Sequence, residues 1–517
     1  MPRRLTTLAL VAIVSTASAH MQTPASTPMH TDGARCSSLL SSLRLPDVRV
    51  TEAREVAADP AAKGAVHVAH CRINGTIGSE IGFGLWLPDA WNGRFLMSGG
   101  GGFVGSLPSP GPDVDRGFAV TTTDTGHKSE GIDARWALDN LERQLDFAYL
   151  ATHRTAVTAK AIVATYYGSD PRYSYFSGCS TGGRQALMEA QRFPDDFDGI
   201  VSGAPVFDWT RAVTAGLALA QALYPDPAVL DKPVITEASL KLVHDAALAA
   251  CDAKDGVADG VIDDPRTCAF DLATVRACPK DAVAPDCLTR AQRAAIARVY
   301  SPLGDGEGVI YEGTPVGAEA EEGGWRAWLT GSDPKMLSES GQPNASWGFS
   351  TQFYRYFVFA NPDWTYKGYD VAGSWRRDTK RITAFMNAEN PDLSAFRARH
   401  GKLLLWHGWA DPALNPLATI RYYESVVARD ASARDDVRLF LLPGVLHCAG
   451  GPGPDRVERT AAIVDWVEKG DAPSQLIAAK RRDAAVVRTR PLCAYPARAV
   501  YKGSGSTDEA ANFTCGR

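Results

Sequence analysis

Short apolar runs, separated by turn-forming residues, recur along the first 205 positions of the chain. Such runs indicate buried strands. The predicted strands are Phe83–Pro88, Arg94–Met97, Ala119–Thr123, Tyr173–Phe176 and Phe197–Val201. Apolar residues at helical spacing over 143–167, and again from Gly183, predict helices between these strands. This alternation of strand and helix is typical of an α/β fold.

The alternation stops near residue 206 and resumes with strands predicted at Lys402–Trp406 and Val437–Leu441. Residues 206–395 are richer in Trp, Gly, Pro and closely spaced cysteines. We interpret 206–395 as an inserted lid domain, and 20–205 with 396–517 as an α/β catalytic domain. A chain of 517 residues exceeds the size of one hydrophobic core, which stops growing at about 250–300 residues.

The first 19 residues predict a signal peptide, because Arg3 and Arg4 precede the apolar run 8–14 and the small-residue site Ala17-Ser18-Ala19. A twin-arginine signal is the alternative. The mature chain is therefore expected to be secreted or periplasmic. No later segment is apolar for the roughly 18 residues that a membrane span requires. A net charge of -5 gives no basic surface for nucleic acid or an anionic membrane.

The ten cysteines are even in number, and in an exported chain this favours five disulfides over metal thiolates. Proximity in sequence suggests four short-range pairs and leaves one long-range pair. The short-range pairs are Cys36 with Cys71, Cys251 with Cys268, Cys278 with Cys287, and Cys493 with Cys515; the long-range pair is Cys179 with Cys448. Ten cysteines also allow hundreds of other connectivities.

Residues 178–183 read Gly-Cys-Ser-Thr-Gly-Gly, which places Ser180 between two glycines, after a predicted strand and before a predicted helix. This is the context of a nucleophile elbow, where a strained turn exposes the serine hydroxyl. The motif alone is weak in a chain with 47 glycines. Thr181 follows the serine and would offer its backbone N–H to an oxyanion. The loop Gly99–Gly102, with Gly101, is the candidate for the second donor, and a plain glycine turn is the alternative.

A catalytic serine requires a base, and hydrolases of this architecture order the triad as serine, acid, histidine. Asp411 and His447 each follow a late predicted strand, in that order, so they are the candidate acid and base. A turn-forming role for Asp411, or His407 or His127 as the base, are the alternatives. Cys448, beside His447, and Cys179, beside Ser180, favour His447 because one disulfide could join the two loops.

The segment 252–264 holds a cluster of aspartates interspersed with glycines, which would repel one another unless solvated or bridged by a hard cation. We predict a structural Ca²⁺ site; the alternative is a solvated acidic loop. Its ligands would be the side chains of Asp252, Asp255 and Asp259 and the backbone carbonyls of Val257 and Val261. The spacing differs from that of an EF-hand.

Together, Gly-Cys-Ser-x-Gly-Gly, His-Gly-x-x-Asp, His-Cys after a Pro-Gly turn, and the Asp-rich loop between cysteines resemble the tannase and feruloyl esterase family. The resemblance covers almost the whole mature chain. It implies an α/β-hydrolase core with a large inserted lid domain, a disulfide joining the neighbours of nucleophile and base, structural Ca²⁺ and no organic cofactor. Thr181 stands where some members have Glu, a difference that keeps the backbone donor.

The resemblance implies a serine esterase that cleaves feruloyl, galloyl or related aromatic esters, free or attached to plant polysaccharide or polyphenol. Tannin acyl hydrolase and terephthalate monoester hydrolase are alternatives within the family. A peptidase and a non-catalytic secreted binding protein are the rivals outside it. One aromatic run could form either the acyl pocket or hydrophobic core, and its members are Trp347, Phe349, Phe353, Tyr354, Tyr356 and Phe357.

Overall fold

The computed structural model describes residues 33–64, 66–331, 337–338 and 340–516, so the predicted signal peptide lies outside the described residues. Within these ranges, no helix has the length and apolar character needed to span a membrane. The largest feature is a nine-stranded sheet of order β1-β2-β3-β5-β4-β6-β7-β10-β11. Its strands are β1 Val48–Val56, β2 His70–Ile77, β3 Ile81–Pro88, β4 Arg94–Ser98, β5 Ala119–Thr123, β6 Tyr173–Cys179, β7 Gly199–Gly203, β10 Lys402–Gly408 and β11 Val437–Leu442.

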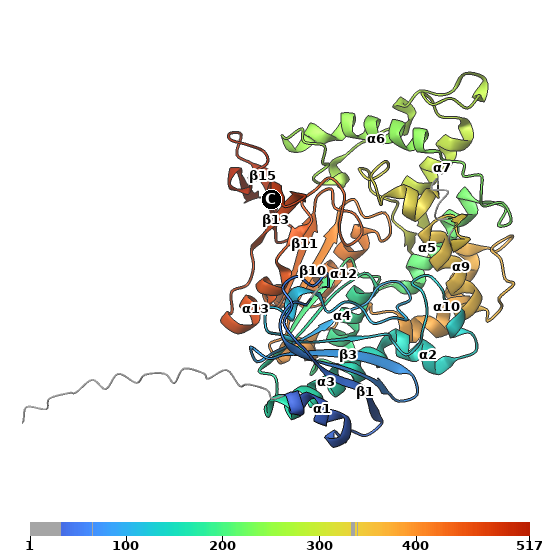
Figure 1. The fold of residues 1–517 in the computed structure, drawn as a ribbon. Helices are drawn as coiled ribbons and strands as arrows, with labels where there is room; N and C mark the ends of the chain where they lie inside the picture. The colour runs from blue at the N-terminus through green and yellow to red at the C-terminus, as the bar shows by residue number, and fades with distance from the viewer. Residues whose placement is uncertain (1–32, 65, 332–336, 339, 517) are drawn as a thin grey trace, which may run out of the picture.

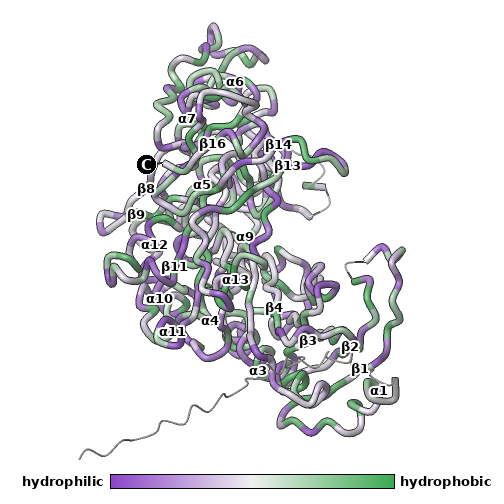
Figure 2. Tube along the Cα trace, turned by 90° about the vertical axis from the view of Figure 1, so that its left-hand side faces the viewer, coloured by the Kyte–Doolittle hydropathy of each residue, from purple (hydrophilic) through white to green (hydrophobic). Residues whose placement is uncertain are grey.

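The sheet is antiparallel at one edge and parallel elsewhere. The pairs β1·β2, β2·β3 and β3·β5 are antiparallel, whereas every pair from β5·β4 to β10·β11 is parallel. The strands predicted from sequence are confirmed, with β7 beginning two residues later than expected. The sequence analysis did not predict β1 and β2, which lie with α1 (Gly33–Ser42) at one end of the molecule (Figure 2).

Both faces of the parallel part are covered by helices, which explains its continuous apolar runs. In β10, Leu403 and Leu405 pack into the core on one face, whereas Leu404 and Trp406 pack into the core on the other. The first core also contains residues of α3 (Ala151–Tyr167), α4 (Thr181–Arg192) and α12 (Pro416–Arg429). The second contains residues of α13 (Arg459–Lys469) and of β14 (Ala485–Cys493).

The predicted lid segment is mainly helical and has a hydrophobic core of its own. Its helices are α5 Trp209–Leu223, α6 Glu237–Cys251, α7 Arg290–Tyr300, α9 Ala345–Phe353, α10 Val371–Met386 and α11 Ser394–Ala398. Helices α5, α9 and α10 lie together to one side of the sheet, and α6 and α7 lie at the top of the view in Figure 1. The segment leaves the sheet after β7 and returns to it at β10, and these two strands are neighbours.

The remaining elements are short helices and small sheets. The helix predicted over 143–167 is confirmed as α2 Leu141–Leu145, a π-helical turn η3 Asp146–Leu150, and α3. Strands β12 Arg456–Val457, β13 Gln475–Arg482 and β14 form a three-stranded sheet. Strands β15 Arg498–Tyr501 with β16 Phe513–Gly516, and β8 Leu303–Gly304 with β9 Val309–Tyr311, form two-stranded sheets.

All ten cysteines are disulfide-bonded, in the five pairs predicted from sequence proximity. Four of these close loops of 9 to 35 residues, whereas Cys179–Cys448 joins residues 269 positions apart. The long-range disulfide therefore connects the two parts of the chain that flank the helical segment.

Arg184 of α4 joins the sheet to the helical segment from a fully buried position. Its guanidinium donates to the carbonyl oxygens of Phe147 at 3.0 Å and of Met386, at the end of α10, at 3.3 Å. It also lies 5.2 Å from the ring centroid of Trp209, in α5. Burial lowers the pKa of Arg184 to about 9. The contacts therefore attach three lid and core elements to the helix that follows the predicted nucleophile.

Glu189, on the same helix, is a fully buried carboxyl group that lies close to Asp196 and His153. Burial and the neighbouring Asp196 carboxylate raise the pKa of Glu189 well above its usual value. In the unfolded chain the group ionises near pH 4.5, whereas the folded chain keeps the proton. The unfolding free energy therefore falls as the pH rises from the unfolded towards the folded pKa.

We expect Glu189→Gln to remove this pH dependence, because the amide does not ionise. Relative to the variant, the wild type should lose about 1.4 kcal/mol of unfolding free energy per pH unit above the unfolded pKa. Urea unfolding of both proteins between about pH 5 and pH 8 measures the difference. Asp195→Asn, at an exposed carboxylate of the adjacent loop, is the control and should follow the wild type. Parallel pH profiles of wild type and Glu189→Gln would contradict the expectation.

Candidate active site

Ser180 is the single residue between β6 and α4, and its backbone is strained at φ 62° and ψ -120°. Its N–H donates to the carbonyl oxygen of Gly203 at 3.0 Å, which fixes the turn against β7. The turn requires glycine on both sides, because a Cβ on Gly178 would lie 2.6 Å from the backbone of Gly182. The geometry is that of the predicted nucleophile elbow, with the serine at the carboxyl end of a parallel strand.

Thr181, the first residue of α4, connects this turn to the glycine loop after β4. Its hydroxyl donates to the carbonyl oxygen of Gly102 at 2.6 Å. The N–H of Gly99 donates to Ser177, and that of Gly100 donates to the side chain of Gln185. The first N–H groups of a helix have no partner within the helix, so the start of α4 is suited to a negative charge.

His447 and Asp411 form a hydrogen-bonded pair beside Ser180. The Nδ1 of His447 lies 2.8 Å from Oδ2 of Asp411. Since a carboxylate accepts, Nδ1 is assigned the proton, and Nε2 is left as an acceptor for a hydroxyl. The ring of His447 also meets Trp328 edge to face, with centroids 4.9 Å apart. The loops after β10 and β11 therefore bring the predicted acid and base together.

Asp411 is held by four contacts in a fully buried site. Its Oδ1 accepts from the backbone N–H groups of Ala413 at 2.8 Å and Leu414 at 3.0 Å. Its Oδ2 contacts both His447 and His407. Burial by itself would raise the pKa of Asp411, but the charges and hydrogen bonds of His447 and His407 hold it well below its usual value. The carboxylate is therefore ionised and fixed in orientation.

The two alternative bases have different surroundings. His407 is fully buried, with Nε2 at 3.1 Å from both Asp411 and the carbonyl oxygen of Leu414 and Nδ1 at 2.8 Å from the hydroxyl of Thr419. His127 is buried against Trp136, with ring centroids 3.6 Å apart, and burial lowers its pKa to about 4. Among the described residues, neither histidine lines the cavity that contains Ser180.

Ser180 and His447 open into a cavity of about 480 Å³, which we call the catalytic cavity. Most of its wall is apolar, and helix α5 and the lid contribute most of it. The wall residues are Gly102, Thr181, Val206, Trp209, Ala212, Val213, Trp328, Ser346, Phe349, Ser350, Ala413 and Leu414. Trp328 belongs to the π-helical turn η8 Arg326–Thr330, and its ring stacks on that of Phe349 at 6.3 Å.

The sequence analysis identified few of these wall residues. In the aromatic run, Phe349 lines the cavity, whereas the other five are buried in the core of the helical segment. Trp209 and Trp328 were missed, because an isolated tryptophan carries no motif. Gly102 lines the cavity, and its neighbour Gly101, predicted as the second donor, is exposed.

The Cys179–Cys448 disulfide joins the residue before Ser180 to the residue after His447. The two Cα atoms are 6.0 Å apart. Because the serine and histidine loops come from distant parts of the chain, the crosslink fixes one loop relative to the other. No other described disulfide reaches this region.

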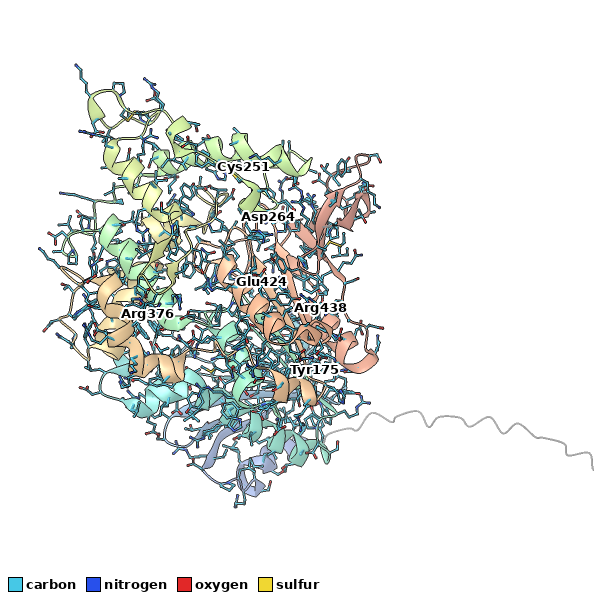
Figure 3. All side chains as sticks on the ribbon, turned by 180° about the vertical axis from the view of Figure 1, so that it is seen from behind. Tyr175, Cys251, Asp264, Arg376, Glu424 and Arg438 are labelled. Atoms are coloured by element: carbon cyan, nitrogen blue, oxygen red, sulfur yellow. A yellow bond between two sulfur atoms is a disulfide. The ribbon has the colours of Figure 1, made fainter. Side chains whose placement is uncertain are left out.

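The Asp-rich loop lies between α6 and the short helix 265–267, and Cys251 and Asp264 mark its ends in Figure 3. Asp252 accepts from the backbone N–H groups of Asp259 and Gly260, and Asp255 accepts from that of Val257. Burial, with the charges of Asp259 and Asp252, raises the pKa of Asp255. Asp259 also forms an ion pair with Arg490 at 2.5 Å. The loop thus gathers hard oxygen donors whose charges are only partly balanced by arginine.

Comparison with known proteins places these features in context. A family model described as tannase and feruloyl esterase matches residues 65–516. An uncharacterised esterase of Xanthomonas campestris pv. campestris is 37% identical, over 93% of this chain and 91% of its own. The mono(2-hydroxyethyl) terephthalate hydrolase of Piscinibacter sakaiensis is 36% identical, over 89% of this chain and 87% of its own.

Feruloyl esterase B from Aspergillus oryzae has a similar structure, with a TM-score of 0.83 and 28% identity over 94% of this chain and 100% of that chain. Together with the mixed sheet flanked by helices, this similarity confirms the predicted α/β-hydrolase fold.

We expect the double substitution Cys179→Ala with Cys448→Ala to lower ester hydrolysis more than it lowers secondary-structure content. Releasing the two loops misplaces reacting groups, and an error of about 1 Å costs on the order of a hundredfold in rate. Initial rates on a nitrophenyl ester and far-ultraviolet circular dichroism measure the two quantities.

The matched control is Cys493→Ala with Cys515→Ala, which removes a disulfide joining β14 and β16 instead. Proportional losses of activity and secondary structure in the first variant would show that the crosslink only maintains the fold.

Proposed function

The chain belongs to the tannase and feruloyl esterase family and is a carboxylic ester hydrolase, and we propose that it cleaves esters of aromatic carboxylic acids through an acyl-enzyme on Ser180. The observation that carries this proposal is the catalytic cavity, in which Ser180 and His447 meet an apolar wall with three aromatic rings. Such a wall suits a flat aromatic acyl group.

In the proposed reaction, Ser180 Oγ attacks the ester carbonyl while His447 Nε2 accepts its proton. Asp411 holds Nδ1 of His447 and stabilises the imidazolium that forms. His447 then donates the proton to the departing alcohol. Water hydrolyses the acyl-enzyme by the same steps in reverse order. His407 acts as a positioning residue, because it contacts the Asp411 oxygen that also accepts from His447.

The negative charge on the carbonyl oxygen requires two fixed N–H donors. We assign one to Thr181, at the start of α4. We assign the second to Gly102 rather than to the predicted Gly101, because Gly102 lines the cavity and accepts the hydroxyl of Thr181. This hydrogen bond keeps the glycine loop against the helix start, so both donors are in place before the substrate binds.

Feruloyl, galloyl and terephthaloyl esters are the substrates named by the relatives, and the cavity admits any of these single-ring acyl groups. A peptidase with the same triad, or a secreted binding protein that has lost catalysis, would be the rival function. The complete Ser180, Asp411 and His447 arrangement supports hydrolysis over binding alone.

Export of the chain is part of the proposal. Five disulfides form and persist in oxidising compartments outside the cytosol. Together with the signal-peptide pattern in the first 19 residues, they support a secreted or periplasmic enzyme.

We expect Ser180→Ala to lower kcat/KM by on the order of 10⁴-fold or more, because the nucleophile is lost. The panel is methyl ferulate, methyl gallate and mono(2-hydroxyethyl) terephthalate, measured as initial rates. Ser346→Ala, at another serine of the same wall, is the control and should keep most of the activity. A wild type that cleaves none of the three esters would refute the substrate class, and cleavage by Ser180→Ala at the wild-type rate would refute the mechanism.

We also propose that the Asp-rich loop binds a structural Ca²⁺. Asp252, Asp255 and Asp259 would supply carboxylate oxygens, and Val257 and Val261 would supply carbonyl oxygens, the hard donors that Ca²⁺ prefers. The fit is supported by Asp263, a buried carboxylate in the same loop with no hydrogen-bond partner among the described residues. A cation would offset this concentration of negative charge and stabilise the loop that follows α6.

We expect removal of calcium by a chelator to lower the unfolding temperature by about 2 °C or more, and added Ca²⁺ to restore it. Differential scanning calorimetry measures the shift. Asp252→Asn should abolish the response to calcium, whereas Asp286→Asn, at an exposed aspartate outside the loop, should keep it. An unfolding temperature that is independent of calcium in the wild type would contradict the site.

A further inference from the structure

A second cavity of about 700 Å³ adjoins the catalytic cavity, and we call it the polar cavity. It lies between α5, the start of α12 and the segment that follows β9. The two cavities share five wall residues, Val206, Ala212, Ser346, Ala413 and Leu414. A ligand whose ester bond lies at Ser180 could therefore extend from one cavity into the other.

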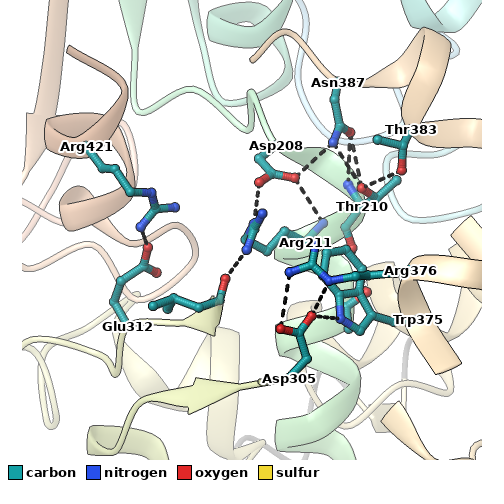
Figure 4. Close-up of polar contacts among 12 residues, drawn as sticks. Asp208, Thr210, Arg211, Asp305, Glu312, Trp375, Arg376, Thr383, Asn387 and Arg421 are labelled. Carbon is teal, nitrogen blue, oxygen red and sulfur yellow. Dashed lines mark hydrogen bonds and ion pairs between the residues drawn. The ribbon is translucent and has the colours of Figure 1, made fainter. Parts of the chain in front are cut away.

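The polar cavity is lined by two ion pairs, on opposite sides of the view in Figure 4. Arg211 pairs with Asp208, and Arg421 pairs with Glu312. All four side chains line the same cavity. Each guanidinium thus already has a carboxylate partner, so the cavity presents donors and acceptors without an excess of either charge.

Arg421 retains hydrogen-bonding capacity for a ligand. A guanidinium has five N–H donors, and Glu312 accepts from Nη1. Among the described residues, no protein acceptor is recorded for the Nε or Nη2 of Arg421. Its side chain is 45% exposed, and that of Glu312 is 13% exposed, so the pair is within reach of a bound molecule.

Arg211 and Asp208 are held rigidly by their neighbours. Arg211 also donates to the carbonyl oxygen of Val309, and its guanidinium lies 5.4 Å from the ring centroid of Trp375. Asp208 accepts from the side-chain amide of Asn387 at 2.9 Å. Polar groups that are fixed before binding lose little conformational entropy when a ligand arrives.

We propose that the polar cavity binds the alcohol portion of the ester, and that this portion is a hydroxyl-rich group such as a sugar. The inference rests on the proposed function, in which the aromatic acyl group occupies the apolar catalytic cavity. Hydroxyl groups both donate and accept, so they match paired guanidinium and carboxylate groups. The wall also includes apolar side chains such as Leu219 and Ile310, which can cover the C–H face of a sugar ring.

The test compares two esters of the same acid, methyl ferulate and 5-O-feruloyl-arabinose. For each protein, the measured quantity is kcat/KM on the sugar ester divided by kcat/KM on the methyl ester. We expect Arg421→Ala and Glu312→Gln to lower this ratio about tenfold or more, mainly through KM of the sugar ester, because each removes hydrogen bonds that involve a charged group. Glu312→Gln preserves shape and so guards against a folding defect in Arg421→Ala.

Arg429→Ala is the matched control, because Arg429 lies on the same helix as Arg421 but pairs with Asp392 outside the polar cavity. Its ratio should equal that of the wild type. An unchanged ratio in both cavity variants would overturn the alcohol subsite while the cleavage of methyl ferulate still supported the proposed function. A larger loss on a ferulate ester of a carboxylated alcohol than on the sugar ester would also overturn it, in favour of an anion site. A wild type that cleaves neither ester would instead refute the proposed function.

Discussion

The structure depends on a one-residue reversal between β6 and α4. Ser180 alone separates a strand from a helix, which forces its backbone to positive φ and brings Gly178 and Gly182 into contact. Such strain, of order 1–3 kcal/mol, persists only where the surroundings hold it. Here the backbone bond to Gly203, the disulfide at Cys179 and the buried Arg184 all act within five residues of the serine. The most strained part of the active site is therefore also the most heavily anchored.

Much of the sheet could be predicted from sequence because its central strands are buried on both faces, so that runs such as Leu403–Trp406 are uniformly apolar. β1 and β2 escaped prediction for the opposite reason. β1 is an edge strand with largely exposed or half-buried residues, and β2 carries polar residues among its apolar ones. The helical segment gave no regular pattern, because loops and short helices interrupt it and its core gathers residues from many elements.

The candidate triad was accessible from sequence because each member belongs to a local motif at the end of a strand. Disulfide pairing was accessible because four pairs are close in sequence and only one remains. The wall of the catalytic cavity was not accessible. Trp209, Trp328 and Phe349 come from three elements and meet only in the folded chain, so no spacing in sequence signals their proximity. Likewise, Gly101 and Gly102 are indistinguishable until the turn places one in the cavity and the other in solvent.

The helical segment leaves the sheet after β7 and re-enters at β10, and these are adjacent parallel strands in continuous register. The sheet is therefore complete without the segment, which enters and leaves through one gap. Insertions, deletions and exchanges within residues 209–398 can alter the walls that face a substrate without shifting the register of the strands that carry Ser180, Asp411 and His447. A topology of this kind separates the evolution of substrate choice from that of catalytic geometry, so that new specificities can arise on an unchanged reaction centre.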